Sequence, residues 1–130
     1  NYLEKVKDET QGNSALTLTL ALSYGSRNEI VSVVREISDK VKNNIISSKK
    51  IDEPVINDHL YTRHLPDVDL LIRTSGEKRI SNFLLWQIAY SELYFTKKMW
   101  PDFGKEDLYK AIISYQNRER RFGKTSEQVK

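Results

Sequence analysis

The chain has 130 residues, of which 38% are hydrophobic and 30% charged, and its formal net charge is +3. This composition is typical of a globular domain, and the mild positive charge suits an anionic substrate or surface but is too small to indicate nucleic-acid binding. The chain has no cysteine, which excludes disulfides and thiolate metal sites. Because no apolar run approaches the ~20 residues of a membrane span and no signal peptide is visible, we expect a cytoplasmic protein.

The first half of the chain predicts a helix, a strand and a second helix. Residues 2–10 have apolar side chains at helical spacing, and we expect them to be the last turns of a helix that begins before Asn1, inside a larger protein. Residues 15–22 alternate leucine with threonine or alanine, a pattern typical of a strand. After a turn at Gly25, apolar residues step by three and four up to Ile45, which predicts an amphipathic helix opening at Asn28.

The second half predicts shorter elements, separated by prolines, glycines and capping residues. They are a short helix capped by Asn57 or Asp58 and running to His64, a buried strand at 68–72, a helix at 83–88 capped by Ser81 or Asn82, a strand at 93–96, and a last helix at 105–121 with Leu108, Ile112 and Tyr115 on its core face. Strands that alternate with helices indicate an α/β fold, with a mostly parallel sheet flanked by helices. No linker or repeat divides the chain into two domains.

A polar loop joins the strand at 68–72 to the helix expected after it. Arg73 ends the strand, Arg79 ends the loop, and Ser81 follows. Ligands of α/β proteins bind beyond the carboxyl ends of the strands, where a helix N-terminus favours an anion and arginine can grip two phosphate oxygens. The pattern therefore predicts a phosphate or diphosphate site. The alternative is that both arginines only form surface ion pairs, which contribute little. The carboxylates considered for such pairs are Asp69, Glu77 and Glu92.

Three other patterns do not define a site by themselves. Asp102-Phe103-Gly104 spells a kinase magnesium motif, but no catalytic-loop or glycine-rich motif accompanies it. His59 and His64 lack further ligands at a recognised metal spacing. The basic run at 118–124 is typical of a solvated helix face. A general anion- or nucleic-acid-binding module stays open as an alternative, and it predicts salt-sensitive binding to many polyanions.

Five blocks of sequence together carry a more specific signal. The longest, at 69–87, is DLLIRTSGEKRISNFLLWQ. The others are AYSELYF at 89–95, WPDF at 100–103, SYGSR at 23–27 and RERRFG at 118–123. In their order along the chain they closely resemble the cis-prenyltransferase family, and most of all its bacterial undecaprenyl diphosphate synthase branch. The resemblance runs from about Leu18 to Gly123, and a match of this length is far more specific than a short motif.

The resemblance implies prenyl transfer. Members of the family condense an allylic diphosphate, typically farnesyl diphosphate, with isopentenyl diphosphate. They repeat the step to build a long cis-polyprenyl diphosphate such as undecaprenyl diphosphate, the lipid carrier for cell-wall synthesis. Fixed cations, hydrogen-bond donors and Mg²⁺ are expected to bind the two diphosphates. The resemblance also implies a homodimer without a nucleic-acid partner, and the lipid product makes peripheral membrane association possible.

Carried over residue by residue, the resemblance assigns roles to several side chains. Arg73, Arg79 and Ser81 match the positions that hold isopentenyl diphosphate, and Glu92 matches a magnesium-associated carboxylate. Arg121 and Gly123 match an Arg-x-Gly motif that reaches a substrate site across the dimer. Residues expected near the active site, without assigned roles, are Tyr24, Gly25 and Arg27, and those expected in the core or the dimer interface are Trp86, Tyr90, Tyr94 and Trp100.

One motif of the family has no match in these residues. It resembles Met-Asp-Gly-Asn-Gly-Arg-Trp-Ala and carries the essential aspartate beside the allylic diphosphate. We therefore expect residues 1–130 to be the C-terminal part of a single cis-prenyltransferase domain, incomplete because the N-terminal half is absent and inactive in condensation alone. The alternative is a non-catalytic accessory subunit of a cis-prenyltransferase complex. Such subunits lose much of the substrate-binding signature, whereas Arg73, Arg79, Ser81 and Glu92 are present here.

Overall fold

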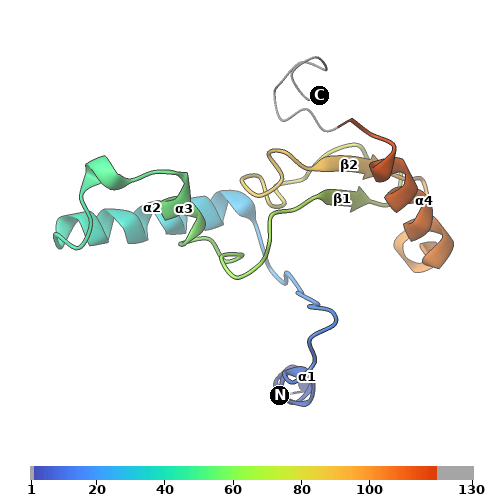
Figure 1. The fold of residues 1–130 in the computed structure, drawn as a ribbon, viewed down its shortest axis with the longest axis horizontal. Coiled ribbons are helices and arrows are strands. Elements are labelled where there is room, and N and C mark those ends of the chain that lie inside the picture. The colour runs from blue at the N-terminus through green and yellow to red at the C-terminus, as the bar shows by residue number, and fades with distance from the viewer. Residues whose placement is uncertain (1, 120–130) are drawn as a thin grey trace.

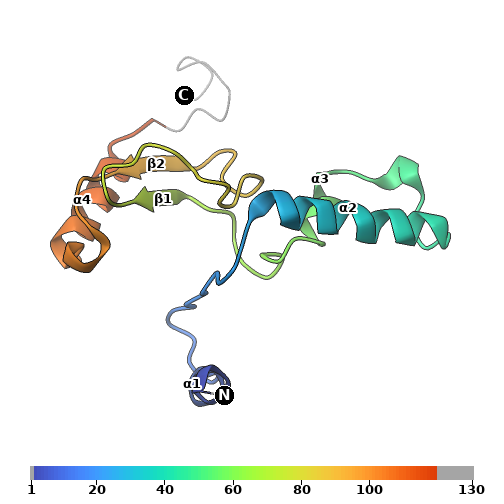
Figure 2. The ribbon, with the colours of Figure 1, turned by 180° about the vertical axis from the view of Figure 1, so that it is seen from behind.

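The computed structural model describes residues 2–119 of the chain. Its helices and strands, in chain order, are α1 (Tyr2–Thr10), α2 (Ser26–Lys42), η1 (Ser48–Lys50), α3 (Glu53–Asn57), β1 (Leu70–Arg73), β2 (Glu92–Phe95), η2 (Trp100–Asp102) and α4 (Lys105–Gln116). Figure 1 shows α2 and α3 together at one end of the molecule, the two strands with α4 at the other, and α1 apart from both groups. The view from behind shows the same arrangement (Figure 2).

β1 and β2 form a two-stranded parallel sheet. Leu70 pairs with Glu92 and Arg73 pairs with Phe95, so both strands begin at one edge of the sheet and end at the other. Leu71 is buried, and α4 packs against β2. The predicted α/β class with parallel strands is therefore confirmed. Both carboxyl ends lie at the same edge, which is where ligands bind in α/β folds.

α2 supplies most of the core at the other end of the molecule. Its residues Val33 and Ile37 lie one turn apart and pack with Leu60, and all three are buried. The partly buried side chains around them are Val41, Val55, Ile56 and Trp86. The predicted amphipathic helix is thus confirmed, although it begins at Ser26 and ends at Lys42 rather than running from Asn28 to Ile45.

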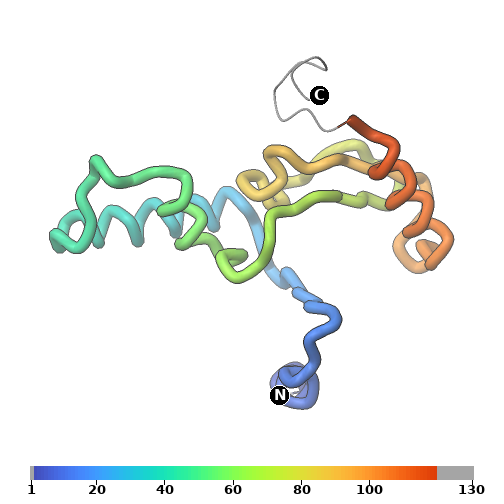
Figure 3. Tube along the Cα trace, in the orientation of Figure 1, coloured from blue at the N-terminus to red at the C-terminus, as the bar shows by residue number. Residues whose placement is uncertain are grey.

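The strand predicted at 15–22 is wrong. The segment pairs with no strand of residues 2–119, and the Cα trace shows it leading away from α2 towards α1 (Figure 3). Its leucines, at positions 16, 18, 20 and 22, are all more than half exposed. Alternation marks a segment that can bury one face, but a strand forms only where a neighbour satisfies its backbone N–H and C=O groups.

The helix predicted at 83–88 is also wrong, because this segment forms consecutive turns. Ser81, Asn82 and Leu84 have φ angles of 53°, 61° and 48°. These values lie in the left-handed region and are incompatible with a right-handed helix. Ser81 and Asn82 therefore do not cap a helix of their own segment, and the apolar residues after them pack from a turn instead.

The short helix predicted up to His64 lies earlier in the chain. It is α3, and its N-cap is Asp52, whose side chain accepts a hydrogen bond from the Val55 N–H at 3.0 Å. Neither Asn57 nor Asp58 is its N-cap, because they stand at its C-terminal end. The prediction missed that Pro54 suits the first turn of a helix, where its missing N–H needs no partner.

α4 is confirmed as a helix, but it ends at Gln116 rather than at 121. Ala111 is its buried residue, whereas Leu108 and Ile112, expected on the core face, are 41% and 38% exposed. Among residues 2–119, no helix combines the length and the apolar character needed to cross a bilayer.

Candidate functional site

Arg73 ends β1 and holds the loop that follows it. Its Nη1 donates hydrogen bonds to the carbonyl oxygen of Arg79 at 2.6 Å and to Ser81 Oγ at 2.8 Å. The Arg73 guanidinium therefore meets the Ser81 hydroxyl and the main chain of Arg79 at the carboxyl end of β1. Within residues 2–119, the Nη2 and Nε hydrogens of Arg73 donate to no protein group, so they can face a ligand.

The loop after β2 supports the loop after β1. The Ser75 N–H donates to the Lys98 carbonyl at 2.7 Å, and the Gly76 N–H donates to the Thr96 carbonyl at 2.8 Å. Gly76 has a φ of 75°, a left-handed conformation that glycine adopts without strain. The two loops are thus fixed to each other at the edge of the sheet where Arg73 lies.

Basic residues outnumber acidic ones in these two loops. They are Arg73, Lys78, Arg79, Lys97 and Lys98, against Glu77 alone in the segments 73–79 and 96–98. Glu77 forms an ion pair with Arg79 Nη1, and both side chains are largely exposed. An exposed pair of this kind contributes little stability and can be exchanged for another anion. The surface-pair alternative therefore describes Arg79, whereas Arg73 binds a carbonyl and a hydroxyl rather than a carboxylate.

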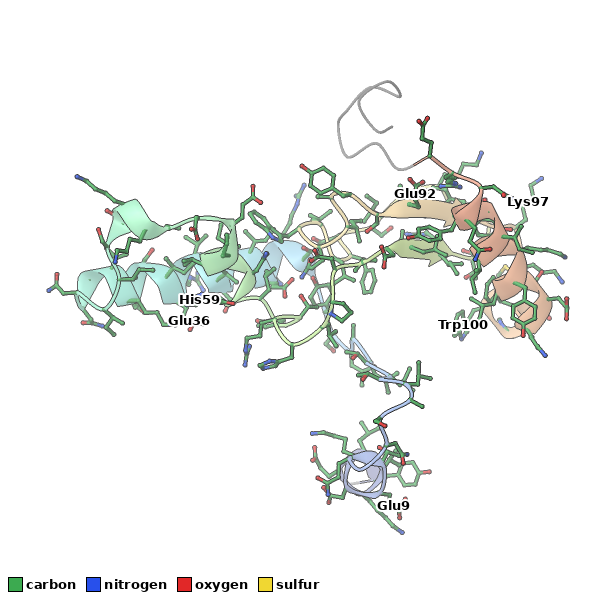
Figure 4. The ribbon with its side chains drawn as sticks, in the orientation of Figure 1. Glu9, Glu36, His59, Glu92, Lys97 and Trp100 are labelled. Atoms are coloured by element: carbon green, nitrogen blue, oxygen red, sulfur yellow. The ribbon has the colours of Figure 1, made fainter. Side chains whose placement is uncertain are left out.

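Glu92 lies at the opposite edge of the sheet. It pairs with Leu70 where the strands begin, and Arg73 lies three residues further on, roughly 10 Å along the strand. Figure 4 labels Glu92 at the start of β2 and Lys97 beyond its end. Glu92 Oε2 accepts a hydrogen bond at 2.7 Å from Nη1 of Arg118, which also donates to the Leu93 carbonyl at 2.9 Å. The structure therefore does not bring Glu92 together with the arginine site.

The described residues do not form a magnesium site by themselves. Residues 2–119 contain no group of three His, Cys, Asp or Glu side chains placed to hold a metal ion. Glu92 offers one carboxylate, and Arg118 already binds one of its oxygens. His59 has other partners, since its Nδ1 lies 2.6 Å from the Val55 carbonyl and its Nε2 lies 2.6 Å from Lys40 Nζ. Mg²⁺ requires near-octahedral oxygen coordination, which this set does not supply.

Sequence reasoning missed Glu29, which has no exposed surface and is the most deeply buried charged residue among residues 2–119. Its Oε2 accepts hydrogen bonds from the Tyr24 hydroxyl at 2.5 Å and from Gln87 Nε2 at 3.1 Å, and its Oε1 accepts one from the Tyr61 N–H at 2.8 Å. Burial, followed by the bond to Glu29, raises the pKa of Tyr24. The available signal was position, since Glu29 lies one turn before Val33 on the apolar stripe of α2.

The structure brings two of the sequence blocks together. The Ser26 N–H donates to the Asn82 carbonyl at 2.8 Å, which joins the block at 23–27 to the block at 69–87. The rings of Tyr24 and Phe83 meet edge to face with their centroids 5.6 Å apart. Arg121 and Gly123 lie outside the described residues.

Comparison with known proteins identifies the family that shares these blocks. The family model described as "Putative undecaprenyl diphosphate synthase" matches residues 1–123. The chain belongs to this undecaprenyl diphosphate synthase family. Isoprenyl transferase of Porphyromonas gingivalis is 55% identical over 127 residues, which cover 98% of this chain and 50% of that protein. Isoprenyl transferase of Clostridium perfringens is 54% identical over 121 residues, which cover 93% of this chain and 46% of that protein.

Solved structures of relatives share the fold of this family member. Lavandulyl diphosphate synthase from Lavandula x intermedia, in complex with dimethylallyl diphosphate, matches with a TM-score of 0.88 and 43% identity, over 93% of this chain and 52% of that one. A probable undecaprenyl diphosphate synthase from Campylobacter jejuni matches with a TM-score of 0.75 and 36% identity, over 94% and 54% of the two chains. The chain spans about half the length of the curated relatives it matches. The predicted family is confirmed, and the roles of single residues stay predictions.

Proposed function

We propose that the chain binds isopentenyl diphosphate and takes part in cis-prenyl transfer, in which that diphosphate is condensed with an allylic diphosphate. The observation that carries the proposal is that the Arg73 guanidinium binds Ser81 Oγ and the Arg79 carbonyl at the carboxyl end of β1. Membership of the family supports it, because relatives at 51–55% identity are named isoprenyl transferase.

The proposed site holds a diphosphate by charge and by geometry. The Nη2 and Nε hydrogens of Arg73 offer a planar fork to two phosphate oxygens, and Arg79 can exchange Glu77 for phosphate. The hydroxyl hydrogen of Ser81 can donate to a phosphate oxygen while its Oγ accepts from Arg73. These residues would orient isopentenyl diphosphate. Its double bond then attacks the allylic carbon, the C–O bond of the allylic substrate breaks so that inorganic diphosphate leaves with the bonding electrons, and a proton is lost.

The allylic substrate belongs to the same proposal. The lavandulyl diphosphate synthase that this chain resembles was solved in complex with dimethylallyl diphosphate. For this chain we propose farnesyl diphosphate as the allylic partner and a long cis-polyprenyl diphosphate, such as undecaprenyl diphosphate, as the product. The 130 residues contain nothing like Met-Asp-Gly-Asn-Gly-Arg-Trp-Ala. We therefore propose that they do not catalyse condensation alone.

The cofactor and the assembly state complete the proposal. We propose Mg²⁺ as the cofactor, with Glu92 as a carboxylate that this chain offers to it. We also propose a homodimer in the cytoplasm, with Tyr90 and Trp100, which are 69% and 74% exposed, as candidates for its interface.

Calorimetric titration of the 130-residue chain with isopentenyl diphosphate tests the site. Arg73→Ala should abolish binding. Arg73→Lys should weaken binding by about tenfold or more, because an ammonium cannot hold the Arg79 carbonyl, Ser81 and a phosphate in one plane. Arg63→Ala is the matched control, since Arg63 is an exposed arginine that contacts the Leu60 carbonyl. Equal, salt-sensitive binding to DNA would favour the general polyanion module instead.

A condensation assay tests the predicted inactivity of the chain alone. The 130 residues receive farnesyl diphosphate, radiolabelled isopentenyl diphosphate and Mg²⁺, and the extracted lipid is counted. We expect no product above a protein-free blank. Sustained product formation would show that these residues contain all the groups the reaction needs.

A further inference from the structure

The segment that carries Ser81 has an unusual backbone. Ser81, Asn82 and Leu84 all adopt left-handed φ angles, although each has a Cβ atom. Such conformations are unfavourable outside glycine, least so for asparagine, and persist only where the surroundings hold them. A specific set of contacts must therefore maintain this segment beside the arginine site.

Those contacts come from the N-terminus of α2. The Ser26 N–H donates to the Asn82 carbonyl at 2.8 Å, and the Arg27 N–H donates to Asn82 Oδ1 at 2.9 Å. In return, Ser26 Oγ accepts a hydrogen bond from the Leu85 N–H at 2.9 Å. Ser26 has no exposed surface. The first turn of α2 thus donates hydrogen bonds to the segment that follows Ser81 and also accepts one from it.

The local sequence explains why the cap comes from so far away. The N-cap residue of α2 is Gly25, which has no side chain to satisfy the free N–H groups of the first turn. A Cβ at this position would lie 3.0 Å from Asn82 Nδ2, closer than a side chain tolerates without a shift. Gly25 therefore offers no side-chain acceptor to the first turn of α2, and its missing Cβ leaves space for Asn82, whose side chain supplies that acceptor.

Neighbouring residues of the segment bind two different elements. Ser81 accepts from Arg73 at the end of β1, and Asn82 binds the start of α2. The position of Ser81 relative to Arg73 consequently depends on where Asn82 holds the chain. We infer that Asn82 is a positioning residue for the diphosphate site, which acts by fixing the segment 79–82 against α2. This inference rests on the proposed function of Arg73, Arg79 and Ser81.

Three substitutions separate the cap from the backbone conformation. Asn82→Asp keeps an acceptor oxygen, tolerates the left-handed φ and places a negative charge at a helix N-terminus. Asn82→Gly keeps the backbone conformation but loses the side-chain acceptor Oδ1. Asn82→Ala loses Oδ1 and also disfavours the left-handed backbone conformation. The control is Asn44, an asparagine of the same conformation, with a φ of 57°, just beyond the C-terminal end of α2.

The first measurement uses the 130-residue chain without ligand, and follows the Arg73 guanidinium by ¹H–¹⁵N NMR. In the wild type and in Asn82→Asp, the bonds to Arg79 and Ser81 should slow guanidinium rotation and give resolved Nη signals. In Asn82→Gly the signals should average, and in Asn44→Gly they should stay resolved. Unchanged Arg73 signals in Asn82→Gly would overturn the inference.

The second measurement is the dissociation constant for isopentenyl diphosphate, taken at a temperature where every variant is folded. Asn82→Gly should weaken binding by about tenfold, the scale of a lost helix cap, and Asn82→Asp should restore it to within about threefold. A residue with a merely structural role would lower the unfolding midpoint without this change in affinity, and that outcome would overturn the inference. If the wild type binds no isopentenyl diphosphate with or without Mg²⁺, the proposed function fails, while the NMR measurement still decides whether Asn82 positions Arg73.

Discussion

At the scale of single residues, Glu29 carries the largest expected effect on stability. It is fully buried, and its two oxygens accept from Tyr24, Tyr61 and Gln87. Removing the carboxylate leaves these donors without their acceptor in a site closed to water. We therefore expect Glu29→Ala to lower the free energy of unfolding by about 3 kcal/mol or more, measured by urea denaturation.

Glu36→Ala is the control on the same helix. Glu36 is 55% exposed and pairs with Lys40 at 2.9 Å, so its removal should cost much less unfolding free energy than Glu29→Ala. Equal losses for the two variants would show that burial of Glu29 does not determine its contribution.

The Tyr24 hydroxyl links this buried carboxylate to pH. Burial, the hydrogen bond to Glu29 and its negative charge raise the pKa of Tyr24 above its ordinary value of 10.0. As the pH rises, the Tyr24 hydroxyl therefore loses its proton in the unfolded state before it does so in the folded state. The resulting stabilisation is complete below pH 10.0 and is lost as the pH rises through the pKa of the folded state.

This sign gives a prediction for Tyr24→Phe. The difference in unfolding free energy between the wild type and Tyr24→Phe should be constant up to about pH 10 and should shrink above it. Denaturation curves between pH 8 and pH 11 measure the difference, and the comparison cancels the titration of the lysines. A difference that stays constant up to pH 11 would mean that burial and Glu29 do not raise the pKa of Tyr24 in the folded state.

At the scale of elements, the N-cap of α3 distinguishes the structure from the sequence pattern. The pattern assigned the cap to Asn57 or Asp58, whereas Asp52 accepts from the Val55 N–H. Asp52→Ala should cost about 1 kcal/mol of unfolding free energy, and Asp58→Ala should change it by less than about 0.5 kcal/mol. Thermal denaturation of both variants measures these losses. A larger loss for Asp58→Ala than for Asp52→Ala would show that the sequence pattern had placed the cap correctly.

What could be predicted at this scale depended on how far apart the interacting residues lie. α2 follows from its own apolar spacing, and Arg73 could be placed at a strand end because the strand and the loop are contiguous. The strand at 15–22 and the helix at 83–88 failed because their outcomes depend on distant partners. Residues 15–22 have no neighbouring strand within the described part of the chain, and Asn82 caps α2 rather than its own segment.

The same distinction applies to the candidate site. Arg73, Arg79 and Ser81 lie within nine residues, so their meeting could be expected from a strand and a tight loop. Glu92 could not be placed, because its position depends on the register of β2 against β1. That register pairs Glu92 with Leu70 at the far edge of the sheet, and no local pattern specifies it.

At the scale of the whole molecule, one segment leaves a row of apolar side chains uncovered. We call it the leucine face, defined as Leu16, Leu18, Leu20 and Leu22. These side chains are 59–83% exposed, and they alternate with threonine and alanine, so that pairing of the segment as a strand would place all four on one side. Covering them would gain about 25 cal/mol for each Å² of apolar surface, and an extended segment with free backbone groups is a template for pairing with other chains. The chain spans about half the length of the curated relatives it matches.

We therefore expect the 130-residue chain to associate through the leucine face in addition to any specific dimer. Light scattering after size exclusion should give a mass that rises with concentration for the wild type. Leu18→Ser with Leu20→Ser should reduce this mass to a constant value of twice the chain, which is the proposed homodimer, because Tyr90 and Trp100, the residues proposed for its interface, lie outside the leucine face. The control, Thr17→Ser with Thr19→Ser, changes the other side of the segment and should leave the wild-type behaviour intact. A constant mass for the wild type would show that the leucines are covered in solution, and a leucine variant at the mass of one chain would refute the homodimer.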